Sequence, residues 1–349
     1  MPMPIQLPPS DPPPRVVVVE APARLHLGFF DLNGGLGRCF GSLGVALDGL
    51  ATRVSASAAD VFGASGAQAA RAEGFARRMA AHLRSDSGLR VVVEQALPEH
   101  VGLGSGTQLA LAVGRAAAQL HGRALPAREV ASVLDRGARS GIGVAAFEQG
   151  GFVVDGGRSP QRDAVPPLLA RFAVPASWRW ILVFDDAGRG LSGAAEVQAF
   201  RRLPPFPEDA AARLCRVVLM QILPALAEAD IARFGAGLTR LQDCVGDHFA
   251  PAQGGRYASA RVGAALQVLQ QSGAAAIGQT SWGPTGFALA AGPEQALALV
   301  DGVRRALGDV PLRFQIHATR NRGADVVVQP ERRRPAALAP RVAYAGAPA

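Results

Sequence analysis

The stretch "GLGSGTQLALAVG", Gly102–Gly114, decides the expected fold because a glycine-rich turn runs directly into a helical pattern. Ser105 is a favoured helix N-cap, and Gln108 three residues later completes a capping-box pattern. The preceding segment "LRVVVEQAL", Leu89–Leu97, is predicted to be a strand. The helix is expected to bury one apolar face, made by residues at helical spacing: Leu109, Val113, Ala116 and Leu120.

This glycine turn predicts an anion site. The first N–H groups of a helix lack partners, and the aligned peptides place about half a positive charge at that end. The glycines let backbone approach an anion without Cβ clashes. The alternative is an ordinary tight turn. The predicted phosphate-binding residues of the loop are Gly102, Gly104, Ser105, Gly106 and Thr107.

The amino-acid composition excludes several classes of function. All 36 basic residues of the 349-residue chain are arginine, and the formal net charge is +8. The absence of lysine excludes a Schiff base to pyridoxal phosphate and the lysine-containing P-loop of nucleotide-binding proteins. Aromatic residues make up only 6% of the chain and no recognition motif accompanies the charge, so no nucleic-acid partner is expected. Anionic small-molecule substrates fit the composition better.

The remaining composition indicates a soluble, cytoplasmic protein. The cysteines Cys39, Cys215 and Cys244 are too far apart for a disulfide framework or a zinc site. The proline-rich residues 1–14 are expected to be disordered and do not form a signal peptide. No apolar run is expected to be long enough to cross a bilayer, so no membrane partner is predicted.

The expected elements come in a mixed order, which favours an α+β fold over a doubly wound sheet. Two domains are expected, at residues 15–170 and 175–330, followed by a loose tail at 331–349. Strands are predicted within 15–32, 34–49, 89–97, 150–157, 178–186, 286–290 and 326–329, and helices within 66–84, 126–140, 208–228, 258–271 and 293–307.

Three motifs in order resemble the GHMP kinase superfamily. They are "APARLHLGFFDLNGG" from Ala21, "LPEHVGLGSGTQLALAVG" from Leu97 and "GQTSWGPTGFALA" from Gly278. The resemblance implies a two-domain α+β fold with the active site between the domains. It also makes Gln279 and Trp282 of the third motif candidate substrate-binding residues. Trp282 could stack on an aromatic substrate, and core packing is the competing interpretation.

One position departs from the kinases of this superfamily. The matching stretch "RSGIGVAAFEQGGFVVDGG", Arg139–Gly157, has Gly143 where many of those kinases carry a catalytic aspartate. Glycine cannot accept a proton or orient a hydroxyl. This speaks against phosphoryl transfer to an alcohol, and an ATP-dependent small-molecule kinase is kept as the alternative function.

The whole pattern resembles a non-kinase branch, the β-ribofuranosylaminobenzene 5′-phosphate synthase family. The further matching stretches are "GRGLSG" from Gly188 and "FAPAQGGRY" from Phe249. The resemblance implies transfer of a phosphoribosyl group from phosphoribosyl pyrophosphate to 4-aminobenzoate, with release of pyrophosphate and carbon dioxide, in methanopterin-type cofactor biosynthesis. Mg²⁺ is the expected cofactor. 4-Hydroxybenzoate remains open as the acceptor, and a homodimer remains open as the assembly.

Within the first motif, Arg24 and His26 alternate along a strand and should face one side. Arg24 could bind a phosphate or the benzoate, because its planar fork pairs with either anion. His26 could donate to the leaving group or accept a proton. Asp31 is a further catalytic candidate. The alternatives are a salt-bridging Arg24, a satisfied interior His26 and a structural Asp31.

Two other stretches carry candidate residues. Glu148 lies in the apolar stretch "VAAFEQGGF", where a carboxylate must be paired or metal-bound, so it is a candidate catalytic residue and Mg²⁺ ligand or else a buried structural partner. The stretch "WILVFDDAGRGLSG" resembles the ribose-phosphate motif of classical phosphoribosyltransferases, although chance is the competing explanation. That resemblance makes Asp185, Asp186 and Arg189 candidates for ribose and phosphate binding.

Overall fold

The computed structural model describes residues 15–161, 164–186 and 193–330, and it describes no side chains for residues 193–197. Two long strands form its centre: β1 (Arg15–Asp31) pairs antiparallel with β2 (Gly41–Ala59). Burial is nearly continuous along both strands, and β1 contributes to two apolar cores: Val17 and Val19 pack in one, and Leu25 and Leu27 in the other. These strands belong to a seven-stranded sheet with β3 (Gly63–Gly66), β4 (Gly88–Gln95), β5 (Phe152–Asp155), β6 (Leu168–Phe172) and β11 (Asp325–Pro330).

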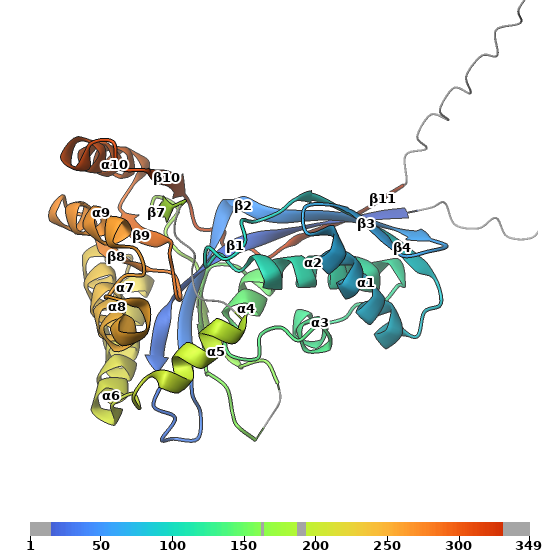
Figure 1. The fold of residues 1–349 in the computed structure, drawn as a ribbon, viewed down its shortest axis with the longest axis horizontal. Coiled ribbons are helices and arrows are strands. Elements are labelled where there is room, and N and C mark those ends of the chain that lie inside the picture. The colour runs from blue at the N-terminus through green and yellow to red at the C-terminus, as the bar shows by residue number, and fades with distance from the viewer. Residues whose placement is uncertain (1–14, 162–163, 187–192, 331–349) are drawn as a thin grey trace, which may run out of the picture.

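The helices of the first half of the chain cover one face of this sheet (Figure 1). They are α1 (Ala69–Leu83), α2 (Ser105–Leu120), α3 (Ala127–Val133) and α4 (Ile142–Glu148). The core between sheet and helices includes Met79, Val91 and Val113. Helix α2 is the most central of them, which fixes the position of the glycine loop at its N-terminus.

A second sheet of four antiparallel strands has the order β10-β7-β9-β8. Helices pack on both of its faces (Figure 1), as the alternation in β7 requires: Ile181 faces one apolar core and Leu182 the other. The strands are β7 (Arg179–Asp185), β8 (Ala276–Gln279), β9 (Gly286–Ala290) and β10 (Leu312–His317). The helices of this half are α5 (Gly193–Arg202), α6 (Glu208–Val217), the π-helix η1 (Val218–Ile222), α7 (Leu223–Ala227), α8 (Ile231–Gln253), α9 (Ala260–Gln271) and α10 (Pro293–Leu307).

The predicted α+β class is confirmed, with corrections to single elements. β11, expected in the second domain, pairs with β1 in the first sheet, so the last described strand returns to the sheet that contains the first. Helix α3 stops at Val133, short of the predicted Ser140. Helix α8 was missed although it is the longest described helix. The expected disordered segments, 1–14 and 331–349, lie outside the described residues.

The helical run Glu208–Ala227 is long and apolar enough to cross a membrane by length and composition, with a mean hydropathy of 1.5 over its most apolar window. The expectation that no such run exists was therefore wrong by that criterion. One face of this run, including Leu214, Ile222 and Leu226, packs in the apolar core. A core helix of this kind is weak evidence for a membrane span.

Candidate active site

The predicted phosphate loop is present, but its cap differs from the prediction. Helix α2 begins at Ser105, and the residue in the cap position is Gly104, which adopts a left-handed conformation with φ of +83°. No side chain caps the helix. Gln108 is buried and donates from Nε2 to the Gly143 carbonyl at 2.9 Å. No side chain therefore occupies the N-terminus of this helix, where first-turn N–H groups can bind an anion.

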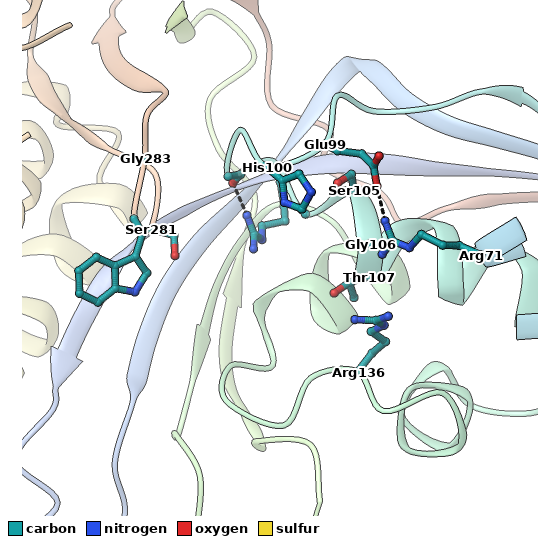
Figure 2. Close-up of a pocket in the computed structure, with 13 residues that line it drawn as sticks. Arg71, Glu99, His100, Ser105, Gly106, Thr107, Arg136, Ser281 and Gly283 are labelled. Atoms are coloured by element: carbon teal, nitrogen blue, oxygen red, sulfur yellow. Dashed lines mark hydrogen bonds and ion pairs between the residues drawn. The ribbon is translucent and has the colours of Figure 1, made fainter. Parts of the chain in front are cut away.

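A pocket of about 520 Å³ opens over this helix N-terminus. Figure 2 shows Arg71 and Arg136 reaching toward the start of the helix, with Ser281 and Gly283 on the opposite side. The lining combines backbone of the glycine loop with three guanidinium groups. Its residues are Arg24, Arg71, Glu99, His100, Gly102, Gly104, Ser105, Gly106, Thr107, Arg136, Ser281, Trp282 and Gly283.

Arg71 and Arg136 are site residues that the sequence prediction missed. A Cβ on Gly106 would lie 2.6 Å from Nη2 of Arg71, so a side chain at this position would displace the guanidinium group of Arg71. Glu99 forms an ion pair with Arg71. Burial lowers the pKa of Arg136, and the positive charges of Arg71 and Arg78 lower it further. Clustered guanidinium groups that repel one another indicate a site that binds an anion of high charge.

Arg24 of the first motif is hydrogen-bonded to the glycine loop. Its side chain donates from Nη1 to the Gly102 carbonyl at 2.5 Å, and its backbone N–H donates to the Leu103 carbonyl at 3.1 Å. A Cβ on Gly104 would lie 3.2 Å from Cγ of Arg24. The structure therefore places Arg24, a candidate for binding phosphate or benzoate, beside the glycine loop.

Gly104→Val is expected to weaken binding of a phosphorylated substrate at least tenfold. The left-handed backbone at this position is strained for any β-branched residue, and the new side chain would press on Arg24. Pyrophosphate titration of the folded variant measures the effect. Gly122→Val is the matched control, because Gly122 also has a positive φ but lies in open space away from the pocket. Equal pyrophosphate affinity in both variants would contradict the loop assignment.

The third motif forms hydrogen bonds with both the first motif and the glycine loop. Thr280 donates from Oγ1 to the Gly102 carbonyl at 2.8 Å and accepts the backbone N–H of His26 at 3.0 Å. The backbone N–H of Ser281 donates to the His26 carbonyl at 3.2 Å. Three segments that are far apart in the sequence therefore meet at one place.

His26 lies in this junction and is only 3% exposed. Burial lowers its pKa well below the usual value, and the charges of Arg24 and Arg139 lower it further. His26 is therefore neutral at pH 7. Its ring packs on Phe29 at a centroid distance of 4.5 Å.

Burial of this neutral imidazole should make the folded chain less stable at acidic pH. The unfolded chain protonates His26 below its ordinary pKa of about 6.5, whereas the folded chain does not, so stability falls as the pH falls. His26→Gln cannot titrate, and its stability should fall less between pH 7 and pH 5, by up to about 2 kcal/mol at about 1.4 kcal/mol per pH unit. Urea unfolding at both pH values measures this difference. The same pH dependence in both proteins would contradict it.

Two predicted catalytic carboxylates do not line the pocket. Asp31 accepts the backbone N–H groups of Asn33 at 2.8 Å and Gly34 at 3.3 Å, so it holds the turn after β1. Glu148 is exposed, which corrects the expectation of a buried carboxylate. It accepts the N–H of Ala127 at 2.9 Å, at the N-terminus of α3.

The predicted ribose-binding acids are also engaged elsewhere. Asp185 is buried and accepts hydrogen bonds from Ser259 at 2.7 Å and from Arg261 at 2.9 and 3.1 Å. Asp186 is exposed and pairs with Arg313 at 3.2 Å. The structure thus gives both acids a structural partner, and neither lines the pocket. Arg189 lies outside the described residues.

Gln279 and Trp282 are part of the packing around the third motif. Gln279 accepts the N–H of Ala258 at 2.7 Å and donates to Gln253 at 3.2 Å. Trp282 stacks on Phe249 with centroids 4.1 Å apart and planes inclined by 9°, and it still lines the pocket. One indole face is therefore already covered by the protein's own ring.

Comparison with known proteins defines the class of the fold. Residues 70–151 match the GHMP kinases N terminal domain, and residues 222–309 match the GHMP kinases C terminal domain. The chain superimposes on homoserine kinase from Cytophaga hutchinsonii with a TM-score of 0.67 at 18% identity, over 89% of this chain and 97% of that chain. The fold is that of a two-domain GHMP kinase.

Relatives with higher sequence identity show which family within the GHMP kinase fold the chain belongs to. The chain is 33% identical to a protein of Methanothermobacter thermautotrophicus, over 89% of this chain and 98% of the relative. It is 34% identical to one of Archaeoglobus fulgidus, over 89% of this chain and 99% of the relative. Both are named beta-ribofuranosylphenol 5′-phosphate synthase. The chain belongs to this family of enzymes, which confirms the resemblance that the motifs indicated.

Proposed function

We propose that this enzyme transfers the phosphoribosyl group of phosphoribosyl pyrophosphate to 4-aminobenzoate, releasing pyrophosphate and carbon dioxide. The observation that carries the proposal is the pocket at the N-terminus of α2, where Arg24, Arg71 and Arg136 surround a helix end that favours anions. A pyrophosphate leaving group needs such donors, because it gains negative charge in the transition state. In this role the product enters methanopterin-type cofactor biosynthesis.

The proposed step needs no net proton transfer. The ring carbon that bears the carboxylate forms a bond to C1 of the ribose, and pyrophosphate leaves with the electron pair of the C1–O bond. The electron pair of the ring–carboxylate bond then returns to the ring as carbon dioxide departs. A neutral, buried His26 is compatible with a reaction that requires no strong base at this stage.

The acceptor has a second candidate. The names of the relatives specify a ribofuranosylphenol, which 4-hydroxybenzoate would give by the same steps. An assay of the purified chain with phosphoribosyl pyrophosphate, Mg²⁺ and either acid tests both acceptors by following carbon dioxide and the ribosylated product. Absence of turnover with both acids, together with ADP formation from ATP and an alcohol, would favour the kinase alternative.

Mg²⁺ would be held mainly by the substrate's diphosphate. The pocket offers the oxygen donors that this ion prefers, in the Glu99 carboxylate and the hydroxyls of Ser105 and Thr107. When bound, the ion would neutralise part of the leaving group's charge. Glu148, the ligand proposed from the sequence, lies outside the pocket. In the described part of the chain, no three His, Cys, Asp or Glu side chains form a cluster of their own.

We therefore expect turnover to require a divalent cation. Treatment with a chelator should reduce the rate at least a hundredfold, and added Mg²⁺ should restore it. The physical reason is that a diphosphate ester carries several negative charges, only part of which three guanidinium groups can balance. Carbon dioxide release before and after chelation measures the effect. Full activity in the chelated protein would contradict the expectation.

A further inference from the structure

Two aromatic ring nitrogen atoms beside the phosphate pocket are buried without a hydrogen-bond partner in the described structure: Nε2 of His26 and Nε1 of Trp282. The two side chains are 3% and 1% exposed. They lie on touching segments, because the backbone N–H of Ser281 donates to the carbonyl of His26. A buried polar atom without a partner costs free energy, so a pair of them at one junction suggests a missing ligand.

Both atoms are hydrogen-bond donors. The backbone N–H of Gly28 donates to Nδ1 of His26 at 3.3 Å, which makes Nδ1 the acceptor of the neutral ring and leaves the proton on Nε2. Burial and the charges of Arg24 and Arg139 keep the ring neutral. The indole nitrogen of Trp282 can only donate. The missing ligand should therefore present acceptor atoms to this junction.

Aromatic side chains surround these donors. The ring of Phe200 meets the edge of Trp282 at a centroid distance of 5.1 Å and that of Phe29 at 6.2 Å. Phe249 covers one face of Trp282, and His26 packs on Phe29. Such walls favour a flat, apolar ring over a sugar or an alkyl alcohol.

The positively charged side chain of Arg139 also lies at this junction of aromatic side chains. The guanidinium group of Arg139 lies over Phe200 at 4.8 Å from the ring centroid, and its charge acts on His26. The loop that carries Arg139 is fixed by the buried carboxylate of Asp155, which accepts hydrogen bonds from Ser140 at 3.0 Å and from the N–H of Gly141 at 2.8 Å. Acceptor atoms, a flat ring and a negative charge together describe an aromatic carboxylate.

We infer that His26, Trp282, Phe200 and Arg139 form the subsite for the aromatic acid, with Nε2–H of His26 donating to its carboxylate. This inference rests on the proposed function for the identity of the acid. It changes the predicted role of His26, which becomes a neutral donor that binds the acceptor and not a group that takes up a proton. Trp282 also lines the phosphate pocket, so the inferred subsite would adjoin it.

The test compares two variants by titration. The full chain is saturated with pyrophosphate, which fills the phosphate pocket, and 4-aminobenzoate or 4-hydroxybenzoate is titrated in by calorimetry. His26→Phe keeps a ring of similar size and removes the donor, and it should weaken binding of the acid at least tenfold. His26→Gln keeps a neutral N–H donor near the Nε2 position and should bind within threefold of the unaltered chain. Pyrophosphate affinity and the melting temperature serve as folding controls.

The outcomes separate this subsite from the proposed reaction. Equal affinity of His26→Phe and the unaltered chain for the acid, or no binding of either acid to the unaltered chain, would overturn the subsite. If His26→Gln lost turnover while keeping the affinity for the acid, the role as a simple donor would be overturned. Binding with the expected pattern, but no product with phosphoribosyl pyrophosphate, would support the subsite and refute the proposed reaction.

Discussion

Arg24→Met should lower kcat/KM for phosphoribosyl pyrophosphate about 10³-fold. The guanidinium of Arg24 lies at the mouth of the glycine loop, bonded to the Gly102 carbonyl, and lines the pocket where the leaving group is proposed to lie. Loss of a single preorganised donor to a developing anion costs about 10²–10³ in rate, and this donor also carries a full charge. The loss should appear in kcat as well as in KM, because the charge of pyrophosphate grows as it leaves.

Two further variants sharpen this prediction. Arg24→Lys keeps the charge and loses the planar fork, so it should recover part of the activity. Arg77→Met is the matched control: Arg77 is exposed on α1, pairs with Glu73 and does not line the pocket, and its loss should change kcat/KM less than twofold. Initial rates and melting temperatures of the purified variants provide the comparison. Activity of a folded Arg24→Met within threefold of the unaltered chain would remove Arg24 from the site.

The glycine loop could be predicted because its signal is local. A glycine turn followed by helical spacing predicts the backbone near Gly104 and Ser105, whereas strand alternation predicts only that Arg24 and His26 share one side of β1. The cap itself was mispredicted. A left-handed Gly104 satisfies the turn without a side chain, and the nearby Gly143 carbonyl takes the Gln108 amide that the capping box would have used.

The rest of the site depends on tertiary contacts that carry no local signal. Arg71 lies on a helix with no motif, and Arg136 follows a short helix that was predicted to be longer. Both arginines reach Gly106 only because α1 and α3 pack beside α2 in the folded chain. One sequence signal was available: Gly106 itself, a glycine in the first turn of a helix, indicates that something approaches closely there.

Burial was the other quantity that the sequence could not supply. Glu148 lies in an apolar stretch, yet it is exposed at the end of α4, where it accepts the N–H of Ala127. Asp185 was expected to hold a ribose, and the structure gives it Arg261 from a helix 76 residues away. β11 shows the same limit for the fold, because its pairing with β1 joins the two ends of the described chain.

The second large effect is expected for Gly143→Asp, which restores an acid at the position where many kinases of this fold carry one. Gly143 is buried at the start of α4, and a Cβ there would lie 3.0 Å from the Thr107 methyl carbon and 3.7 Å from Nε2 of Gln108. The new carboxylate would therefore stand beside the phosphate loop. At contact range, like charges repel by about 1–4 kcal/mol, depending on solvent access.

Synthase activity should fall about 10²-fold in this variant, mainly through a raised KM for phosphoribosyl pyrophosphate, because Thr107 belongs to the pocket proposed for its diphosphate. Gly143→Asn is the matched control, since it has almost the same shape without the charge. It should lose less than tenfold, and the difference between the two variants isolates the electrostatic part. Equal losses would show that crowding against Thr107, and not charge, causes the effect.

The variant should also fail to become a kinase. Phosphoryl transfer needs an alcohol held in line with a γ-phosphate, and a misplacement of about 1 Å can cost about a hundredfold. A single carboxylate does not create that alcohol site, because the junction next to the loop is walled by Phe29, Phe200 and Trp282, which favour a flat ring. Incubation of Gly143→Asp with ATP and candidate alcohols should yield no ADP above background. ADP formation that depends on the alcohol would mean that the loss of one aspartate separates this branch from the kinases, and undiminished synthase turnover would place Gly143 outside the site.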